Sequence, residues 1–296
     1  MSSTPLWGCG TALVTPFNAN GAVDEGALRA LVDWQLAEGI HFLVPCGSTG
    51  EAATMTVDEQ RRVVEVVVKQ VAGRVPVVAG AGSNDTQKAI ALSKTMHDAG
   101  ATHLLHTSPM YNKPPQRGIV AHYRAIAATT PLPIVVYNVP GRTGSNVEAK
   151  TTLELATTPN IVAVKEASGN LSQIADILAQ RPGSFAVLSG DDELTLPIMA
   201  LGGDGIISVI SNVTPRPLVQ LCEKMRAGDL AGARALHFAL LPWMRAAFIE
   251  SNPLPAKAAL AMLGKIQNVL RSPLVPLAGD RSAAVRSALA TAGVKL

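Results

Sequence analysis

The sequence predicts a (β/α)8 TIM barrel followed by a C-terminal helical extension. Eight short apolar runs rich in Val and Ile recur roughly 20–35 residues apart, and each is followed by a helix-like segment. Near-continuous apolar runs of this kind are typical of parallel strands that are covered on both faces. A doubly wound open sheet uses the same units, but it usually has fewer strands. No G-x-G-x-x-G or G-x-x-x-x-G-K-[ST] phosphate loop follows an early run, so the barrel is the favoured architecture.

The eight runs define the expected strands. In chain order they are GTALVTPF (10–17), IHFLVPCG (40–47), VPVVAGAG (75–82), THLLHTSP (102–109), PIVVYNVP (133–140), IVAVKEAS (161–168), FAVLSGDD (185–192) and GIISVI (205–210). The segments between them have helical periodicity, as in DEGALRALVDWQLAEG (24–39) and DEQRRVVEVVVKQVAG (58–73). Several begin with an Asp, Asn or Thr cap and end at Gly, which supports helices at these places.

After residue 210 the pattern becomes helical only. The segments are PRPLVQLCEKMRAG (215–228), DLAGARALHFALLPWMRAAF (229–248), PAKAALAMLG (255–264) and RSAAVRSALATAG (281–293). We expect a barrel over residues 1–225 that carries the site, and a helical extension over residues 226–296 without a separate linker.

Composition excludes several classes of protein. The chain has 296 residues, 48% apolar and 16% charged, which favours a sizeable core. The net charge of +3 is spread without basic runs, so nothing favours nucleic acid as a partner. Lys69 and Arg74 interrupt the Val-rich stretch 63–78, and we expect no membrane span. The N-terminus lacks a basic region ahead of an apolar stretch, so we expect no signal peptide.

The cysteines and histidines do not form a metal or disulfide pattern. Cys9, Cys46 and Cys222 are odd in number and far apart, with no C-x-x-C. We interpret them as free thiols in a reducing cytosol, and Cys46, although close to the candidate site, as a buried thiol. The six histidines share no spacing, and none is assigned to catalysis or metal.

Polar residues gather where the expected strands end, which is where a barrel places its function. The segments are GSTGE, SPMYN, YNVPGRTG, KEASG and SGDD. Lys165 closes the apolar run IVAV, so its side chain must enter the barrel mouth or pair with a carboxylate such as Glu166. Burial lowers the pKa of a lysine, and the free amine is a nucleophile toward carbonyls. The residues alone leave a Schiff-base lysine and a structural lysine equally open.

Three further features could support such a lysine. Tyr137, near the end of the fifth run, could shuttle a proton without carrying charge, or it could be a core aromatic. Arg142 follows in a Gly-rich loop and could hold a carboxylate, or it could be a solvated arginine. GSTGE, with Ser48 and Thr49, offers backbone N–H groups that could cradle an anion, although many loops have this composition.

These motifs, in this order and spacing, resemble the dihydrodipicolinate synthase/N-acetylneuraminate lyase family of class I aldolases. The similarity covers nearly the whole chain, from GTALVTPF through SGDD and GIISV into the C-terminal helices. The resemblance implies that Lys165 forms an imine with pyruvate, and that Tyr137 relays protons together with Ser48 and Tyr111. It further implies that Tyr111 reaches into a neighbouring subunit's site and that Arg142 binds the carboxylate of aspartate semialdehyde. Thr49, Gly190 and Ile207 match positions that line the pyruvate pocket.

The implied reaction condenses pyruvate with (S)-aspartate 4-semialdehyde in the diaminopimelate/lysine pathway. The imine on Lys165 becomes an enamine, which adds to the aldehyde, and the substrate amine then displaces the lysine and closes a ring. No metal or organic cofactor is expected, because the protonated imine is the electron sink. The implied partners are these two small molecules, and the implied assembly is a homo-oligomer, usually a dimer of dimers. We expect a cytoplasmic protein.

Two departures from the family pattern leave alternatives open. Ser48 stands where the synthases usually have threonine, and GSTGE is common among the lyases. An aldolase or lyase for a 2-keto-3-deoxy sugar acid or N-acetylneuraminate is therefore the second hypothesis, and a keto-acid sensor without turnover is the third. The family members that L-lysine inhibits bind it in a cleft at the dimer interface. The resemblance places Val57, Gln60, Lys88 and Met110 at positions that differ from that cleft, whereas Asn84 is the same as in those members. Because Lys88 would repel the effector's ammonium, we expect little inhibition by L-lysine.

Overall fold

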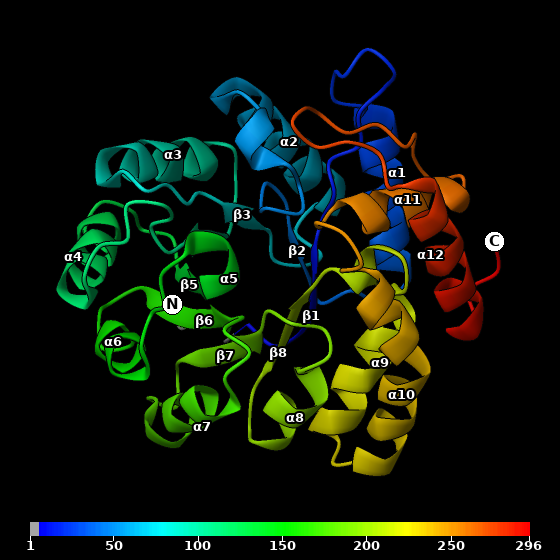
Figure 1. The fold of residues 1–296 in the computed structure, drawn as a ribbon. Coiled ribbons are helices and arrows are strands. Elements are labelled where there is room, and N and C mark those ends of the chain that lie inside the picture. The colour runs from blue at the N-terminus through cyan, green and yellow to red at the C-terminus, as the bar shows by residue number, and fades with distance from the viewer. Residues whose placement is uncertain (1–5) are drawn as a thin grey trace.

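The computed structural model describes residues 6–296, and it has the predicted TIM barrel (Figure 1). Eight parallel strands lie in the order β2-β1-β8-β7-β6-β5-β4-β3. They are β1 (Gly8–Ala12), β2 (Phe42–Val44), β3 (Val78–Gly80), β4 (His103–Thr107), β5 (Ile134–Asn138), β6 (Ile161–Glu166), β7 (Ala186–Ser189) and β8 (Gly205–Ser208). Every strand falls within its predicted run except at the start of β1, and the open-sheet alternative is wrong.

Contacts between β2 and β3 close the barrel. Leu43 forms an isolated parallel bridge with Val77, and the N–H of Gly80 donates to the carbonyl of Pro45 at 2.9 Å. The strands are shorter than the apolar runs that predict them. The remaining residues of the runs lie in the loops at the strand ends, where their backbone N–H and C=O groups are not part of the regular hydrogen bonding between strands.

Helices surround the barrel in the first 226 residues. They are α1 (Glu25–Ala37), α2 (Val57–Val71), α3 (Thr86–Asp98), α4 (Gln116–Ala127), α5 (Pro140–Thr143), α6 (Ala149–Leu155), α7 (Leu171–Gln180), α8 (Thr195–Ala200) and α9 (Pro215–Arg226), with 3-10 turns at Ala52–Thr54 and Ile210–Asn212. The predicted caps are present: Asp24 begins α1, and Thr56 begins α2 in a capping box with Glu59. No helix of residues 6–296 is long and apolar enough to cross a membrane.

Alternate strand residues fill the barrel interior, and the intervening ones face the helices. The interior cluster consists of Leu6, Ala12, Phe42, Val44, Val78, Leu105, Val135, Tyr137, Val139, Ala163, Ala186, Leu188 and Ile207. Lys165 follows Ala163 by two residues and therefore faces the interior, whereas Glu166 faces outward. This alternation decides the sides on which the functional groups lie.

The extension consists of α10 (Leu230–Ala246), α11 (Leu254–Met262) and α12 (Gly279–Thr291). Figure 1 shows these helices beside α9 and α1, along one side of the barrel. Lys257 of α11 forms a fully buried ion pair with Glu51, which lies in the loop after β2. The predicted division after residue 225 falls in the last turn of α9 and stays a prediction, and residues 1–5 of the first predicted domain lie outside the described residues.

Candidate active site

Lys165 lies near the end of β6 and is only 5% exposed. The pKa of its ammonium is lowered from 10.5 to about 7, mainly by burial; the charge of Asp192 opposes this shift, and the nearby Arg142 adds to it. The neighbouring Glu166 faces the other side of the strand and is not its partner. A substantial fraction of Lys165 is therefore a free amine at neutral pH, as nucleophilic attack on a carbonyl requires.

Tyr137 of β5 is the direct register partner of Lys165. The Nζ atom of Lys165 lies 4.1 Å from the centre of the Tyr137 ring. Burial raises the pKa of the phenol to about 12, and Arg142 partly opposes this rise. The hydroxyl group therefore stays protonated at neutral pH and can donate or relay a proton beside the amine.

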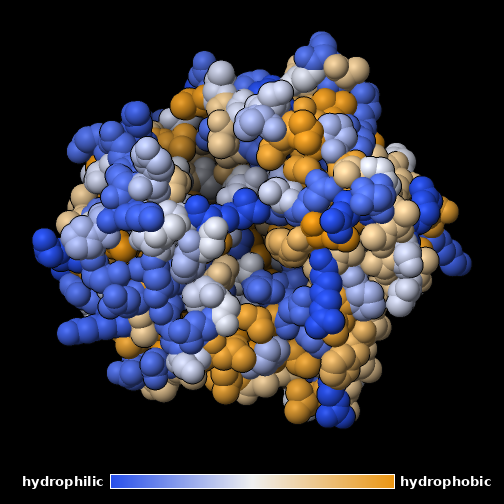
Figure 2. All heavy atoms as spheres, in the orientation of Figure 1, coloured by the Kyte–Doolittle hydropathy of each residue, from blue (hydrophilic) through white to orange (hydrophobic). Residues whose placement is uncertain are grey.

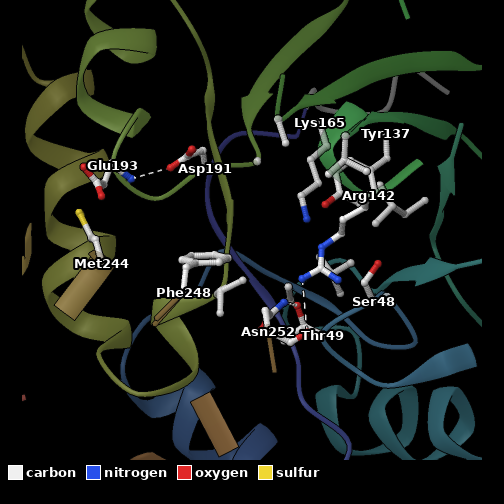
Figure 3. A pocket seen from close by; sticks show the side chains of 18 of the residues that line it. Ser48, Thr49, Tyr137, Arg142, Lys165, Asp191, Glu193, Met244, Phe248 and Asn252 are labelled. Carbon is white, nitrogen blue, oxygen red and sulfur yellow. Dashed lines mark hydrogen bonds between the residues drawn. The ribbon is translucent and has the colours of Figure 1, made fainter. Parts of the chain in front are cut away.

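The two side chains open into a cavity of about 340 Å³ at the mouth of the barrel (Figure 3). Its lining includes four further predicted site residues: Ser48, Thr49, Arg142 and Gly190. Figure 3 shows Arg142 directed between Lys165 and the pair formed by Thr49 and Asn252. The outer surface is hollowed near its centre in the view of Figure 2. The structure therefore brings together six of the residues that the sequence singled out.

Arg142 lies in the short helix α5, and its expected placement in an irregular loop was wrong. Pro140 begins this helix with a fixed φ, and Gly144 ends it in the left-handed region with φ 74°. The guanidinium donates to the main-chain carbonyl of Asn252 at 3.3 Å. The side chain of Asn252 donates to the Thr49 hydroxyl oxygen at 2.8 Å. Asn252 thus links the loops after β2 and β5 from the side of the extension.

Gly190 leaves the space that Lys165 occupies. A Cβ atom at Gly190 would lie 3.1 Å from Cγ and Cε of Lys165 and 2.7 Å from Cβ of Ala167. The N–H of Gly190 also donates to the carbonyl of Glu166 at 2.7 Å, which holds the ends of β6 and β7 together. The residue is a close-packing position beside the lysine.

Two predicted site residues do not line this cavity. Tyr111 is 88% exposed, and its N–H donates to the carbonyl of Thr143 at 3.1 Å. Ile207 is fully buried in the barrel interior. The role of Tyr111 in a neighbouring subunit, and with it the complete hydroxyl relay, stays a prediction.

Several residues of the site were missed in the sequence. Asp192 is buried beside the end of β8 and accepts hydrogen bonds from the Ser208 hydroxyl at 2.6 Å and the Val209 N–H at 3.2 Å. Burial raises the pKa of its carboxyl to about 6. The motif SGDD pointed to this strand end, but nothing in it distinguished Asp192 from Asp191. The cavity itself is lined by Asp191 and Glu193 of this segment, and by residues from further along the chain, for which no motif existed: Met244, Arg245, Phe248 and Asn252.

A second cavity of about 510 Å³ adjoins the first and shares Ser48, Arg142 and Asn252 with it. Gln60 and Met110, two of the predicted effector-cleft positions, line this second cavity. Val57 and Lys88 lie on the exposed surface. Among residues 6–296, no group of three or more His, Cys, Asp or Glu side chains is placed to hold a metal ion, and all three cysteines are free and buried.

Comparison with known proteins places nearly the whole chain in one family. The model of the dihydrodipicolinate synthetase family matches residues 5–292. The chain is 51% identical to the 4-hydroxy-tetrahydrodipicolinate synthase of Koribacter versatilis over 290 residues, which are 98% of this chain and 97% of that protein.

Solved structures agree in fold along the same length. The chloride-inhibited dihydrodipicolinate synthase of Acinetobacter baumannii, complexed with pyruvate, is 39% identical with a TM-score of 0.96, covering 98% of this chain and 99% of that one. The enzyme of Cyanidioschyzon merolae with lysine bound is 42% identical with a TM-score of 0.95 and the same coverage. Because both the family model and the half-identical relative extend over nearly the whole length, the chain belongs to the dihydrodipicolinate synthetase family and is a lyase.

Proposed function

We propose that the chain is a 4-hydroxy-tetrahydrodipicolinate synthase, which condenses pyruvate with (S)-aspartate 4-semialdehyde in the diaminopimelate/lysine pathway. The observation that carries the proposal is a buried Lys165 with a pKa of about 7, placed 4.1 Å from the Tyr137 ring at the base of the cavity. The name of the relative from Koribacter versatilis and the pyruvate complex of the Acinetobacter enzyme support it.

The chemistry begins when the free amine of Lys165 attacks the ketone carbon of pyruvate. The carbinolamine loses water as Tyr137 carries a proton to the departing hydroxyl, and a protonated imine results. Loss of a methyl proton gives an enamine, which forms a carbon–carbon bond to the aldehyde. The amine of the semialdehyde then displaces Lys165 and closes the ring. The imine itself accepts the electrons, so we propose that no metal or organic cofactor takes part.

Arg142 is the group proposed to hold the carboxylate of the semialdehyde. It lines the same cavity as Lys165, and its bond to Asn252 holds it over the mouth. A guanidinium can bind a carboxylate with two parallel hydrogen bonds. A sugar chain would instead require hydroxyl partners at this place, which is why Arg142 favours the semialdehyde over a sugar acid.

Three further properties belong to the proposal. Tyr111 is exposed and has a strained φ of 71°, which supports the proposal that it reaches into a neighbouring subunit. The proposed assembly is therefore a homo-oligomer, with a dimer as the minimum unit and a dimer of dimers as the assembly.

The three free, buried cysteines support a cytoplasmic location. The exposed ammonium of Lys88 supports insensitivity to L-lysine, and strong inhibition at sub-millimolar L-lysine in a steady-state assay would contradict it.

The central experiment is to trap the imine. Incubation with pyruvate and borohydride, followed by peptide mass spectrometry, should place a reduced pyruvyl adduct on Lys165. Absence of this adduct would refute both an aldolase and a synthase. A coupled assay should then show turnover of pyruvate with aspartate semialdehyde and no cleavage of N-acetylneuraminate or 2-keto-3-deoxygluconate.

Arg142→Ala tests the choice of aldehyde within that assay. The variant should lose semialdehyde turnover by about 100-fold, because a charged hydrogen-bonded contact to the second substrate is lost. It should still form the pyruvate adduct, since Arg142 makes the smallest of the three contributions to the pKa of Lys165. Equal loss of both activities would show that Arg142 does not discriminate between the two substrates.

A further inference from the structure

Two polar side chains lie directly behind the reacting pair, on the outer face of the barrel. Asn138 follows Tyr137 in β5, and Glu166 follows Lys165 in β6. The strands place Asn138 opposite Glu166, just as they place Tyr137 opposite Lys165. Asn138 is fully buried and Glu166 is 1% exposed. Because strand residues alternate, the two pairs lie on opposite faces of the same two strands, with only the backbone between them.

The Glu166 carboxylate is held by hydrogen bonds rather than by a cation. It accepts from the Asn138 amide at 3.1 Å, the Ser168 N–H at 2.7 Å and the Gln173 amide at 3.2 Å. Among residues 6–296, no Lys, Arg or His forms a salt bridge with it. Burial of a carboxylate without a cation destabilises the fold unless several hydrogen-bond donors are directed at it. The Glu166 carboxylate therefore depends on these three donors.

Asn138 extends the network to the segment that follows Arg142. Its amide oxygen accepts from the Val147 N–H at 2.9 Å, and its amide nitrogen donates to the Asn146 side chain at 2.8 Å. The Asn146 amide in turn donates to Gln173 of α7 at 2.8 Å. The four side chains Asn138, Asn146, Glu166 and Gln173, called here the rear network, therefore join β5, β6, α7 and the chain beyond α5.

We propose that the rear network is a positioning device for the imine chemistry. It holds Lys165 against Tyr137 and fixes the far end of the segment that carries Arg142. None of its members lines the reaction cavity, so each acts through a neighbour in the chain. The network also accepts hydrogen bonds from the N–H groups of Ser168 and Val147, and a purely structural role of this kind would affect stability without changing the chemistry of Lys165. This inference rests on the proposed function.

Glu166→Gln tests the network with minimal change of shape. Three donors face this position, and a carboxamide replaces one of the two acceptor oxygens with a further donor. At least one N–H group then faces another, and the end of β6 must shift. Lys165 would leave its desolvated position, and its free-amine fraction at neutral pH would fall.

The measurement is the rate of pyruvate imine formation at several pH values, quenched with borohydride at set times and quantified by mass spectrometry. For Glu166→Gln we expect a rate about fivefold lower at pH 7 and a profile moved by about one pH unit to higher pH, with most of the rate recovered at high pH. The titratable or charged groups nearest Lys165 are Tyr137, Arg142 and Asp192, and the cavity is also lined by Asp191, Glu193 and Arg245; none of them is changed. Loss of the Glu166 charge alone would lower the pKa of Lys165 and move the profile to lower pH, so the direction of the shift separates repositioning from a direct effect of charge.

Two companion variants separate positioning from stability. Gln173→Ala removes a half-buried donor to Glu166 and is easily tolerated by the fold, and it should move the profile in the same direction by a smaller amount. Thr11 lies in β1 and is as fully buried as Asn138. Thr11→Val removes its hydrogen bonds to Gln35 at 2.6 Å and to Ser211 at 2.8 Å. It should lower the melting temperature without moving the profile.

The outcomes are distinct. If both network variants keep the profile of the parent protein, or if Thr11→Val moves it equally, the rear network is only structural and the inference is overturned. If the parent protein forms no adduct at all, the proposed function fails first. A shift confined to Glu166→Gln and Gln173→Ala supports the inference, because a general loss of stability would not change the pH profile.

Discussion

The Lys165 amine lies over the face of the Tyr137 ring, with 4.1 Å between Nζ and the ring centre. The strand register produces this contact, since β5 and β6 place the two residues opposite each other on the interior face. The ring face attracts the protonated form of the amine, whereas burial opposes that form. The pKa of about 7 shows that burial is the stronger effect.

The pH dependence of imine formation should follow this amine. Because the free amine is the reactive form, the rate should rise with pH through a midpoint near 7 and then level off. A lysine in water would give a midpoint near 10.5. The rate of adduct formation with pyruvate across pH 5 to 10 checks this, and a rate still climbing steeply above pH 9 would contradict the burial argument.

Replacement of Lys165 by Met should stabilise the fold at neutral pH. The folded-state pKa of Lys165 is depressed, so between about pH 7 and 10.5 the unfolded chain binds more protons and stability rises with pH. The destabilisation is therefore complete below pH 7 and disappears near pH 10.5. We expect Lys165→Met to gain about 2–5 kcal/mol in urea unfolding at pH 7 and almost nothing at pH 10.5. An equal gain at both pH values would indicate an effect of packing rather than charge.

Tyr137→Phe should retain the ring beside Lys165 and remove only the proton carrier. We expect the rate of imine formation to fall by about 100-fold, while the affinity for pyruvate and the melting temperature stay nearly constant. Tyr123→Phe provides the control for loss of a buried phenol hydroxyl, because Tyr123 donates to the carbonyl of His106 at 2.7 Å and does not line the cavity. That variant should lose stability and keep the rate of imine formation.

Gly190→Ala should disturb the lysine directly. The added methyl would lie 3.1 Å from two carbons of Lys165 and 2.7 Å from Ala167, which is too close without a shift. Adduct formation should fall by about tenfold or more at a cost of about 1–3 kcal/mol in stability. The double variant Gly190→Ala with Ala167→Gly should regain part of the rate. Gly183→Ala, with no neighbour within 4 Å, should have no effect on catalysis.

Lys257→Met should show that the extension is integral to the fold. It leaves Glu51 buried and without its cation, which costs about 3–5 kcal/mol in unfolding free energy. The double variant Lys257→Met with Glu51→Gln should be less destabilised than the single one, because no unpaired charge remains. Lys94→Ala, from the exposed pair with Asp98, should change stability by less than about 1 kcal/mol. Equal losses for Lys257→Met and Lys94→Ala would contradict the proposed anchoring role.

Much of the fold could be predicted from local patterns. The recurrence of apolar runs and amphipathic helices reflects burial on both faces of parallel strands, and that pattern is visible residue by residue. Six of the eight singled-out site residues line one cavity because strand ends of a barrel meet at one mouth. The local structure around Arg142 was predicted wrongly. The pattern indicated a loop, but this residue lies in a short helix that begins at Pro140 and is ended by Gly144.

The sequence by itself determined the barrel, the lysine at the mouth and the family motifs, since these depend on local alternation and on residue types at fixed spacing. The tertiary structure alone decided that Asp192 is the buried carboxylate near Lys165 and that Asn252 joins Thr49 to Arg142. The physical reason is that burial, charge and hydrogen bonding act between residues far apart in the chain. The pKa of Lys165 is the clearest example, because it is set by desolvation that no single segment of the sequence contains.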